Sequence, residues 1–186
     1  MQPAARQLCV PFDAATARSL RAGEQVLLSG TILAARDAAH KRMVETLEQG
    51  ESLPFSLAGA IIYYLGPSPA RPGQVIGAAG PTTAGRMDTY TPCLLAHGLR
   101  GMIGKGYRSA TVAAAIREYG APYLAAVGGA GALLSRCIKH YTVLAYPELG
   151  PEAVAALAVE NFPAIVVMDV HGGDWYRTGQ APYCEL

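Results

Sequence analysis

Short apolar segments that stop at glycine or proline recur along this chain, and they constrain its fold more than any other feature. Residues 60–65, 122–127 and 163–170 each have the length and the branched or aromatic side chains of one buried β-strand. Weaker patterns of the same kind predict further strands at residues 26–28, 31–33, 74–79, 100–103 and 141–145. Gly30 separates the first two of these segments and indicates a bulge or bend.

Helical patterns alternate with these strands. Residues 37–49 carry an apolar face, with Asp37 placed to cap the first turn and Gly50 placed to end the helix. Residues 109–120 begin with a serine cap and end at a glycine, which predicts a second helix. A short helix is expected at residues 91–97, where a proline stands in the first turn.

The order of these elements predicts an α/β fold, because strands alternate with helices along the chain. Paired β segments near both ends favour a mixed sheet or a small barrel flanked by helices over a doubly wound sheet. Residues 152–161 fit either a helix or a strand. With 186 residues, the chain is long enough for one domain with a substantial core, and we expect residues 1–186 to form that single domain.

The composition limits the partners that this chain can have. Its net charge of +1 argues against a nucleic-acid partner, because phosphate binding usually requires an excess of basic residues. Apolar residues make up 51% of the chain and charged residues 16%, which suggests that another chain covers part of its surface. The sequence shows no apolar run of membrane-spanning length and no signal-peptide pattern, so we expect a cytoplasmic location.

The four cysteines lie far apart in the sequence and include no C-x-x-C pair. This spacing argues against a structural zinc site, and against an iron–sulfur cluster that this chain would bind alone. We interpret these residues as thiols of a reducing compartment: Cys9, Cys93, Cys137 and Cys184.

Three polar loops follow predicted strands, and each carries a strong cation: Arg36, Arg86 or Lys105. In α/β sheets, ligand sites gather beyond the carboxyl ends of strands. An arginine fork can donate two parallel hydrogen bonds to a carboxylate, whereas lysine adds a point charge. Thr82 and Thr83 add hydroxyls that donate to an anion, or that accept a proton once a neighbour activates them. The loops predict a pocket for a small ligand with more than one negative group.

Each of these residues also has a purely structural interpretation. In that interpretation Arg36 pairs with a surface acid, the two threonines cap the following helix, and Lys105 is an exposed turn residue. For Asp37 we favour a cap or an ion pair with Arg36 over catalysis. Structural roles are also favoured for the remaining candidates: His40 as a hydrogen-bonding residue, Asp88 as a loop organiser, and His97, His140 and His171 as non-catalytic residues.

Two glycine-rich segments resemble nucleotide-binding motifs without matching them. The segment GMIGKG is too short for a P-loop and has a glycine where Ser or Thr would follow the lysine. The segment GGAGAL lacks the third glycine of a dinucleotide-binding fingerprint and has no suitably placed acid behind it. A serine or cysteine triad is also not favoured, because no nucleophile lies in an elbow-like context.

Taken together, five segments resemble the class I, iron–sulfur-dependent fumarate hydratases. They are GTILAARDAAH, GPTTAGRMD, MIGKG, GGAGALL and NFPAIVVMD, and the similarity extends over about residues 10–176. The most specific of these features are T-x-x-x-R-M-D followed by G-K-G, with R-D-x-x-H upstream. More closely, the chain resembles the C-terminal domain of these enzymes, which is a separate β subunit in many microbes.

The resemblance implies a swivelling β/β/α domain and the reversible hydration of fumarate to L-malate. A [4Fe–4S] cluster would be held by three cysteines of a partner α subunit, and the active site would lie between the two subunits, typically in an α2β2 assembly. Arg36, Arg86 and Lys105 would grip the substrate carboxylates, and Thr83 would add a further contact. Thr82 would belong to the proton-transfer apparatus, together with an acid from the partner.

Two other interpretations stay open. The sister family, L-tartrate dehydratase, has a similar β subunit, although its members tend to carry Glu after Arg-Met, where this chain has Asp88. The chain would otherwise be a dicarboxylate-binding module that lacks a catalytic partner.

Overall fold

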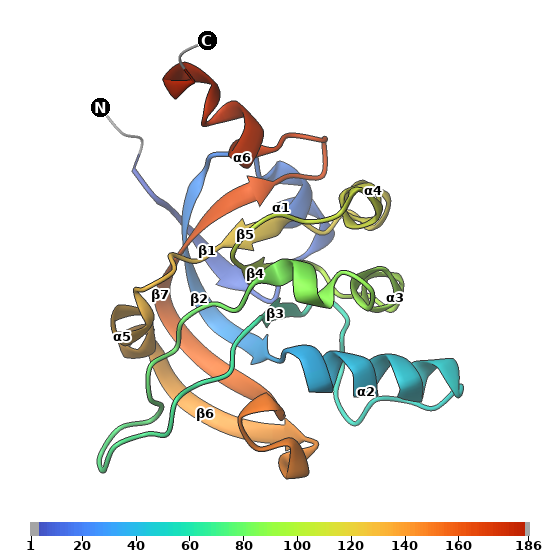
Figure 1. Cartoon of the computed structure of the whole chain (residues 1–186), viewed down its shortest axis with the longest axis vertical. Coiled ribbons are helices and arrows are strands. Elements are labelled where there is room, and N and C mark those ends of the chain that lie inside the picture. The colour runs from blue at the N-terminus through green and yellow to red at the C-terminus, as the bar shows by residue number, and fades with distance from the viewer. Residues whose placement is uncertain (1–3, 185–186) are drawn as a thin grey trace.

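The computed structural model describes residues 4–184, and its centre is a small closed barrel of five strands (Figure 1). Strands β2, β3, β4 and β5 run parallel to their neighbours, and β7 closes the barrel by pairing antiparallel with both β5 and β2. This arrangement confirms the predicted α/β class and the mixed, barrel-like sheet. The barrel strands are β2 (Gln25–Ala34), β3 (Ile61–Tyr63), β4 (Gly101–Gly104), β5 (Tyr123–Ala125) and β7 (Val154–Met168).

Two further strands extend the barrel. Strand β1 (Arg6–Val10) pairs parallel with β2, and β6 (Ile138–Ala145) pairs antiparallel with the first half of β7. The ambiguous segment at residues 152–161 and the strand predicted at 163–170 largely merge into β7, which has 15 residues. Gly30 lies at a register shift within β2, as predicted, and a side chain there would collide with the Val10 carbonyl oxygen of β1.

The prediction of a strand at residues 74–79 is wrong, because these residues form no strand in the structure. This stretch belongs to an extended excursion between β3 and the 3-10 helix η1, and single hydrogen bonds rather than a ladder hold it. The Ser68 hydroxyl accepts from the Ala78 amide at 2.8 Å, and the Ala79 amide donates to the Gly131 carbonyl at 3.0 Å. A side chain at Gly77 would collide with the Ser68 carbonyl oxygen, so a close approach of two chain segments takes the place of strand pairing.

Helices α2, α3 and α4 pack along one side of the barrel (Figure 1). Helix α4 has Ser109 as its cap and ends at Gly120, whose φ of 66° suits glycine, so this prediction is confirmed. Asp37 is not the cap of α2, because Arg36 occupies that position. The helices are α1 (Ala14–Ser19), α2 (Asp37–Glu48), α3 (Thr91–Ala96), α4 (Ala110–Tyr119), α5 (Gly131–Leu134) and α6 (Trp175–Thr178), and the 3-10 helices are η1 (Ala84–Met87), η2 (Ser135–Cys137), η3 (Pro147–Glu152) and η4 (Ala181–Tyr183).

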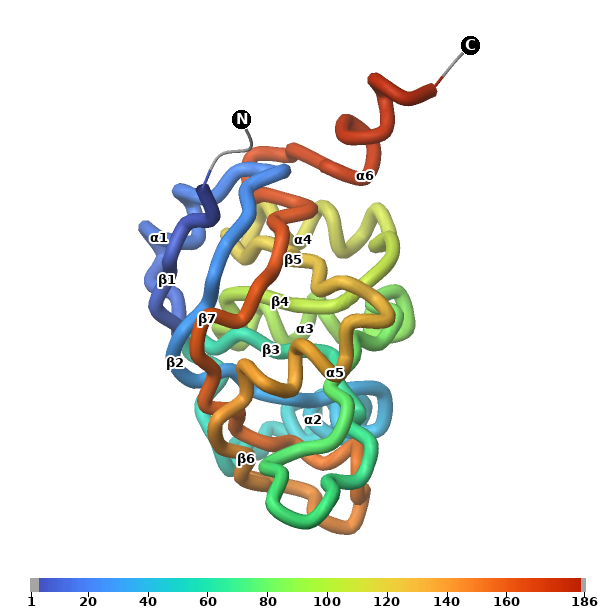
Figure 2. The backbone as a smooth tube through the Cα atoms, turned by 90° about the vertical axis from the view of Figure 1, so that its left-hand side faces the viewer, coloured from blue at the N-terminus to red at the C-terminus, as the bar shows by residue number. Residues whose placement is uncertain are grey.

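The core has two parts, one inside the barrel and one between the barrel and its helices. Consecutive side chains at the end of β3 point to opposite sides, as strand geometry requires. Tyr63 enters the barrel, where its ring meets Phe162 edge-on at 5.1 Å, whereas Tyr64 faces the helices. Figure 2 shows the C-terminal segment with α6 standing out from one end of the barrel. Among residues 4–184, none of the helices combines the length and the apolar character that a bilayer crossing requires.

Candidate functional site

The parallel strands of the barrel bring the three predicted loops to one edge, because the carboxyl ends of β2, β3 and β4 lie side by side. Arg36 follows β2 and Lys105 follows β4. Thr83 forms a parallel bridge with Lys105, whose amide donates to the Thr82 carbonyl oxygen at 3.2 Å. Arg86 follows within η1. The five predicted site residues therefore gather at one edge of the barrel.

The two threonines lie in a short extended segment that is fixed from both sides. The Thr82 amide donates to the Tyr64 carbonyl at 2.7 Å, and the Ala84 amide donates to the Lys105 carbonyl at 2.8 Å. Side chains alternate in such a segment, and Thr82 is half-buried while Thr83 is exposed. Thr83 occupies the cap position of η1 without a capping hydrogen bond from its side chain, so the capping interpretation fails for this residue.

Arg86 pairs with Asp37 rather than standing alone. Its Nε lies 2.8 Å from Asp37 Oδ1, and 54% of the arginine side chain is exposed. The predicted partner of Asp37 was Arg36, so that prediction is wrong. No hydrogen bond of the two terminal nitrogens of the Arg86 guanidinium is found among the described residues, which leaves them available to a ligand. Asp37 Oδ2 is buried and has no hydrogen-bond partner among the described residues.

Arg36 pairs with Glu152, an acid from the far end of the sequence. Glu152 Oε1 lies 2.9 Å from Arg36 Nη2, and its Oε2 accepts from the Ala38 amide at 2.8 Å. The guanidinium lies against the backbone of Gly66, where a Cβ would come within 2.5 Å of Arg36 Cζ. The Arg36 Nε is buried without a partner among the described residues. A buried donor of this kind is costly unless an acceptor reaches it.

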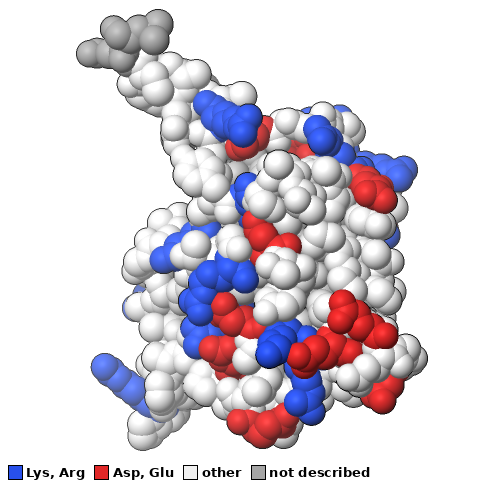
Figure 3. Space-filling view, turned by 45° about the vertical axis from the view of Figure 1, so that its right-hand side comes forward, with Lys and Arg blue, Asp and Glu red and all other residues white. Residues whose placement is uncertain are grey.

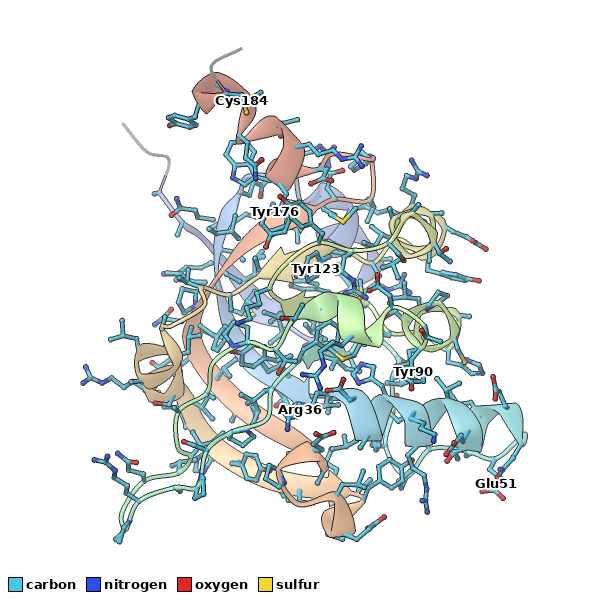
Figure 4. The ribbon with its side chains drawn as sticks, in the orientation of Figure 1. Arg36, Glu51, Tyr90, Tyr123, Tyr176 and Cys184 are labelled. Atoms are coloured by element: carbon cyan, nitrogen blue, oxygen red, sulfur yellow. The ribbon has the colours of Figure 1, made fainter. Side chains whose placement is uncertain are left out.

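Lys105 is exposed, and no carboxylate among the described residues lies within ion-pair distance of it. Its loop is nevertheless held firmly from two directions. The Gly106 amide donates to the Tyr176 hydroxyl at 3.1 Å, and the Tyr123 hydroxyl donates to the Gly106 carbonyl at 3.0 Å. Figure 4 shows the two tyrosines close together, Tyr123 on β5 and Tyr176 on α6. Gly106 has a φ of 81°, a conformation that favours glycine.

Asp88 organises the loop that carries Arg86, as predicted. Its carboxylate binds Arg108 Nε at 2.7 Å and accepts from the Ser109 amide at 2.5 Å. The Arg108 side chain is fully buried and donates further to the Thr91 hydroxyl at 2.7 Å and to the Tyr64 hydroxyl at 3.0 Å. Arg108 thus links η1, α3 and the end of β3.

His40 is a structural residue, as predicted. It is fully buried in α2, its Nδ1 lies 3.0 Å from the Arg36 carbonyl oxygen, and its ring meets Tyr64 edge-on at 5.2 Å. Burial lowers the pKa of His40 to about 4, so the ring is neutral at pH 7. Among residues 4–184, no group of three or more His, Cys, Asp or Glu side chains is placed to hold a metal ion.

The edge of the barrel that carries the five predicted site residues is open and has a small excess of positive charge. Three cations, Arg36, Arg86 and Lys105, face two acids, Asp37 and Glu152. Five hollows on the surface of residues 4–184 are lined by other residues and include none of Arg36, Arg86, Lys105 and the two threonines. On the face shown in Figure 3, acidic and basic side chains are interspersed, so no broad basic surface covers it. The three cations therefore lie together at an open edge of the barrel.

Comparison with known proteins identifies the family. A family described as "Fumarase C-terminus" matches residues 7–179. The chain belongs to this family. It is 44% identical to Fumarate hydratase 2 of Leishmania major over 156 residues, and 43% identical to the anaerobic class I fumarate hydratase of Escherichia coli strain K12 over 152 residues. These matches cover 83% and 81% of this chain but only 28% of each relative.

A third relative has a comparable length. The chain is 40% identical over 166 residues to the putative L(+)-tartrate dehydratase subunit beta of Methanocaldococcus jannaschii, with 86% of this chain and 85% of that protein covered. The resemblance that the sequence motifs indicated is therefore confirmed at the level of the family.

Sequence reasoning missed the residues that hold the site in shape, namely Arg108, Tyr123, Glu152 and Tyr176. Arg108 stands three residues after Lys105, so its place beside a predicted ligand loop was a usable signal. Glu152 offered none, because it begins a segment that fits either a helix or a strand and lies more than a hundred residues from Arg36.

Proposed function

We propose that this chain is the β subunit of a class I fumarate hydratase, a hydro-lyase that reversibly adds water to fumarate to give L-malate. One observation carries the proposal: three cations from three different loops gather at one edge of the barrel, where two carboxylates among the described residues pair with them. A dicarboxylate supplies two further acceptors of the kind that these cations bind.

In this proposal Arg36 and Arg86 bind the substrate carboxylates and Lys105 adds a third positive charge. Removal of a proton beside a carboxylate places a second negative charge on it. Fixed cations aimed at that charge stabilise the transition state more than the ground state. The acids that already bind Arg36 and Arg86 fix both guanidinium groups before substrate arrives, which lowers the entropy lost on binding.

Thr82 is our candidate for proton transfer and Thr83 for a further substrate contact. The Thr82 backbone is anchored by hydrogen bonds to Tyr64 and Lys105, so the point from which its side chain projects is fixed beside the loop of Lys105. A threonine hydroxyl is a weak base unless a neighbour activates it, so we propose that an acid from the partner assists it.

The partner and its cluster belong to the proposal as well. The open site, and the fact that the chain spans about 28% of the two fumarate hydratases compared above, support a second protein that covers this edge of the barrel. Cys9, Cys93, Cys137 and Cys184 are not grouped, and residues 4–184 do not fit a cluster, so we assign a [4Fe–4S] cluster to that α subunit. An α2β2 assembly, a cytoplasmic location and a single domain over residues 1–186 stay predictions.

A tartrate dehydratase is the second candidate, because a putative tartrate dehydratase β subunit matches this chain over most of its own length. Asp88 favours fumarate only indirectly, since its carboxylate binds Arg108 and the Ser109 amide. The deciding experiment is anaerobic. This chain is combined with its cluster-loaded partner, and the ultraviolet absorbance of fumarate is followed, with L-tartrate and mesaconate as parallel substrates. Turnover of tartrate alone, or of no diacid by an intact complex, would overturn the fumarase assignment.

The Arg86→Ala variant tests the site within the active complex. Loss of a charge-assisted contact to a buried carboxylate should cost about 3 kcal/mol, which corresponds to a fall in kcat/KM of roughly 100-fold. Arg71→Ala removes an exposed arginine from the excursion after β3 and serves as the matched control, with kcat/KM unchanged. An Arg86→Ala enzyme that stays within twofold of the wild type would remove Arg86 from the site.

A further inference from the structure

Glu152 uses both of its carboxylate oxygens at the edge of the proposed site. One oxygen pairs with Arg36 Nη2 at 2.9 Å and the other accepts from the Ala38 amide at 2.8 Å. The residue ends η3, which connects β6 to β7, and Figure 4 shows Arg36 between the start of α2 and this segment. A single acid from the β6–β7 connection thus joins an arginine to the first turn of a helix.

The position of Glu152 offsets two positive groups that lie next to each other. Arg36 occupies the cap position of α2 without capping it through its own side chain, so a guanidinium lies next to the positive end of a helix dipole. Glu152 faces both positive groups at once. Gly66 closes a further side of the guanidinium, and the buried Nε has no hydrogen-bond partner among the described residues. The orientation of Arg36 therefore depends on Glu152.

We propose that Glu152 is a positioning residue, which holds the guanidinium of Arg36 in the orientation that binds a substrate carboxylate. This inference rests on the proposed function. It predicts a change in substrate affinity opposite in sign to the change expected from charge alone. Coulomb's law alone says that removing an acid beside a site for a dianion should tighten substrate binding. If Glu152 positions Arg36, removing the acid should instead weaken substrate binding, because Arg36 is then free to turn away.

The Glu152→Gln variant tests whether substrate binding weakens or tightens. KM is measured in the assembled complex, with whichever diacid the wild type turns over. We assign Arg36 to the substrate carboxylate that gains no charge in the transition state, where its contact is uniform, so we expect KM to rise at least about tenfold and kcat to stay within about threefold. Glu148→Gln is the matched control, an exposed acid in the same 3-10 helix. A KM that falls or stays within twofold of the wild type would overturn the proposal.

A double substitution separates positioning from general damage. In an Arg36→Lys background, adding Glu152→Gln should change KM by less than about twofold, because the guanidinium that Glu152 orients is already gone. A full additive effect of the two substitutions would show that Glu152 acts independently of Arg36 and would refute its role.

A measurement on the chain alone keeps this test independent of turnover. Nuclear magnetic resonance follows hydrogen exchange at the Arg36 Nε–H group, which is buried in the wild type. Glu152→Gln should accelerate this exchange at least about tenfold, and Glu148→Gln should not. Unchanged exchange in Glu152→Gln would overturn the inference. If the wild-type complex turns over no diacid, the proposed function fails, while the exchange result still decides whether Glu152 orients Arg36.

Discussion

Replacing Arg108 with methionine should destabilise the fold more than any surface substitution. Methionine fills similar space but removes the fully buried guanidinium, which bonds to Asp88, Thr91 and Tyr64 at 2.7–3.0 Å. It also removes cation–π contacts, since Arg108 Cζ lies 5.3 Å from the Tyr64 ring centre and 5.1 Å from that of Tyr123. Asp88, only 15% exposed, would keep the Ser109 amide as its partner.

The magnitude follows from these contacts. Breaking a buried ion pair by removing one partner typically costs about 3–5 kcal/mol, because the remaining charge is left without compensation. With a urea m-value of about 2 kcal/mol per molar, the unfolding midpoint should fall by about 1.5–2.5 M. Circular dichroism during urea titration of the chain measures this midpoint.

The controls decide whether the pair is the cause. Arg117→Met removes an exposed arginine from α4 and should shift the midpoint by less than about 0.3 M. Adding Asp88→Asn to Arg108→Met should recover part of the loss, because the uncompensated charge is then absent. A midpoint for Arg108→Met within about 0.5 M of the wild type would refute the reasoning.

Three further predictions concern single residues. Gly66→Ala should lower kcat/KM of the complex at least about tenfold while the urea midpoint falls by less than about 0.5 M, because the new Cβ displaces only the end of the Arg36 side chain. His40 has a pKa of about 4 in the folded protein, below its ordinary 6.5, so the unfolded chain binds more protons between these values. The free energy of unfolding should therefore fall by about 3 kcal/mol as pH drops from 6.5 to 4, and His40→Gln should reduce this dependence. Thr82→Val should lower kcat at least about 100-fold and Thr83→Val less than about tenfold, measured as fumarate turnover, and equal losses would contradict the assignment of proton transfer to Thr82.

The sequence by itself determined most elements of local structure, because these depend on neighbouring residues. Ser109 and Gly120 bound α4, and Gly30 marks the irregularity in β2, since caps and glycine conformations are local properties. The proposed site residues Arg36, Arg86 and Lys105 could be selected because each follows a predicted strand and carries a charge. The segment wrongly predicted as a strand at residues 74–79 had an apolar pattern, but no strand of residues 4–184 pairs with it.

Only the tertiary structure decided which charges meet. Asp37 adjoins Arg36 in the sequence, yet it binds Arg86, and Arg36 binds Glu152 from the β6–β7 connection. Residues 152–161, which fit either a helix or a strand, likewise belong largely to the long strand β7, because β2 and β6 pair with β7 from both sides. Ion pairs and strand pairs depend on distances across space. The closure of the barrel sets those distances, and no window of neighbouring residues contains them.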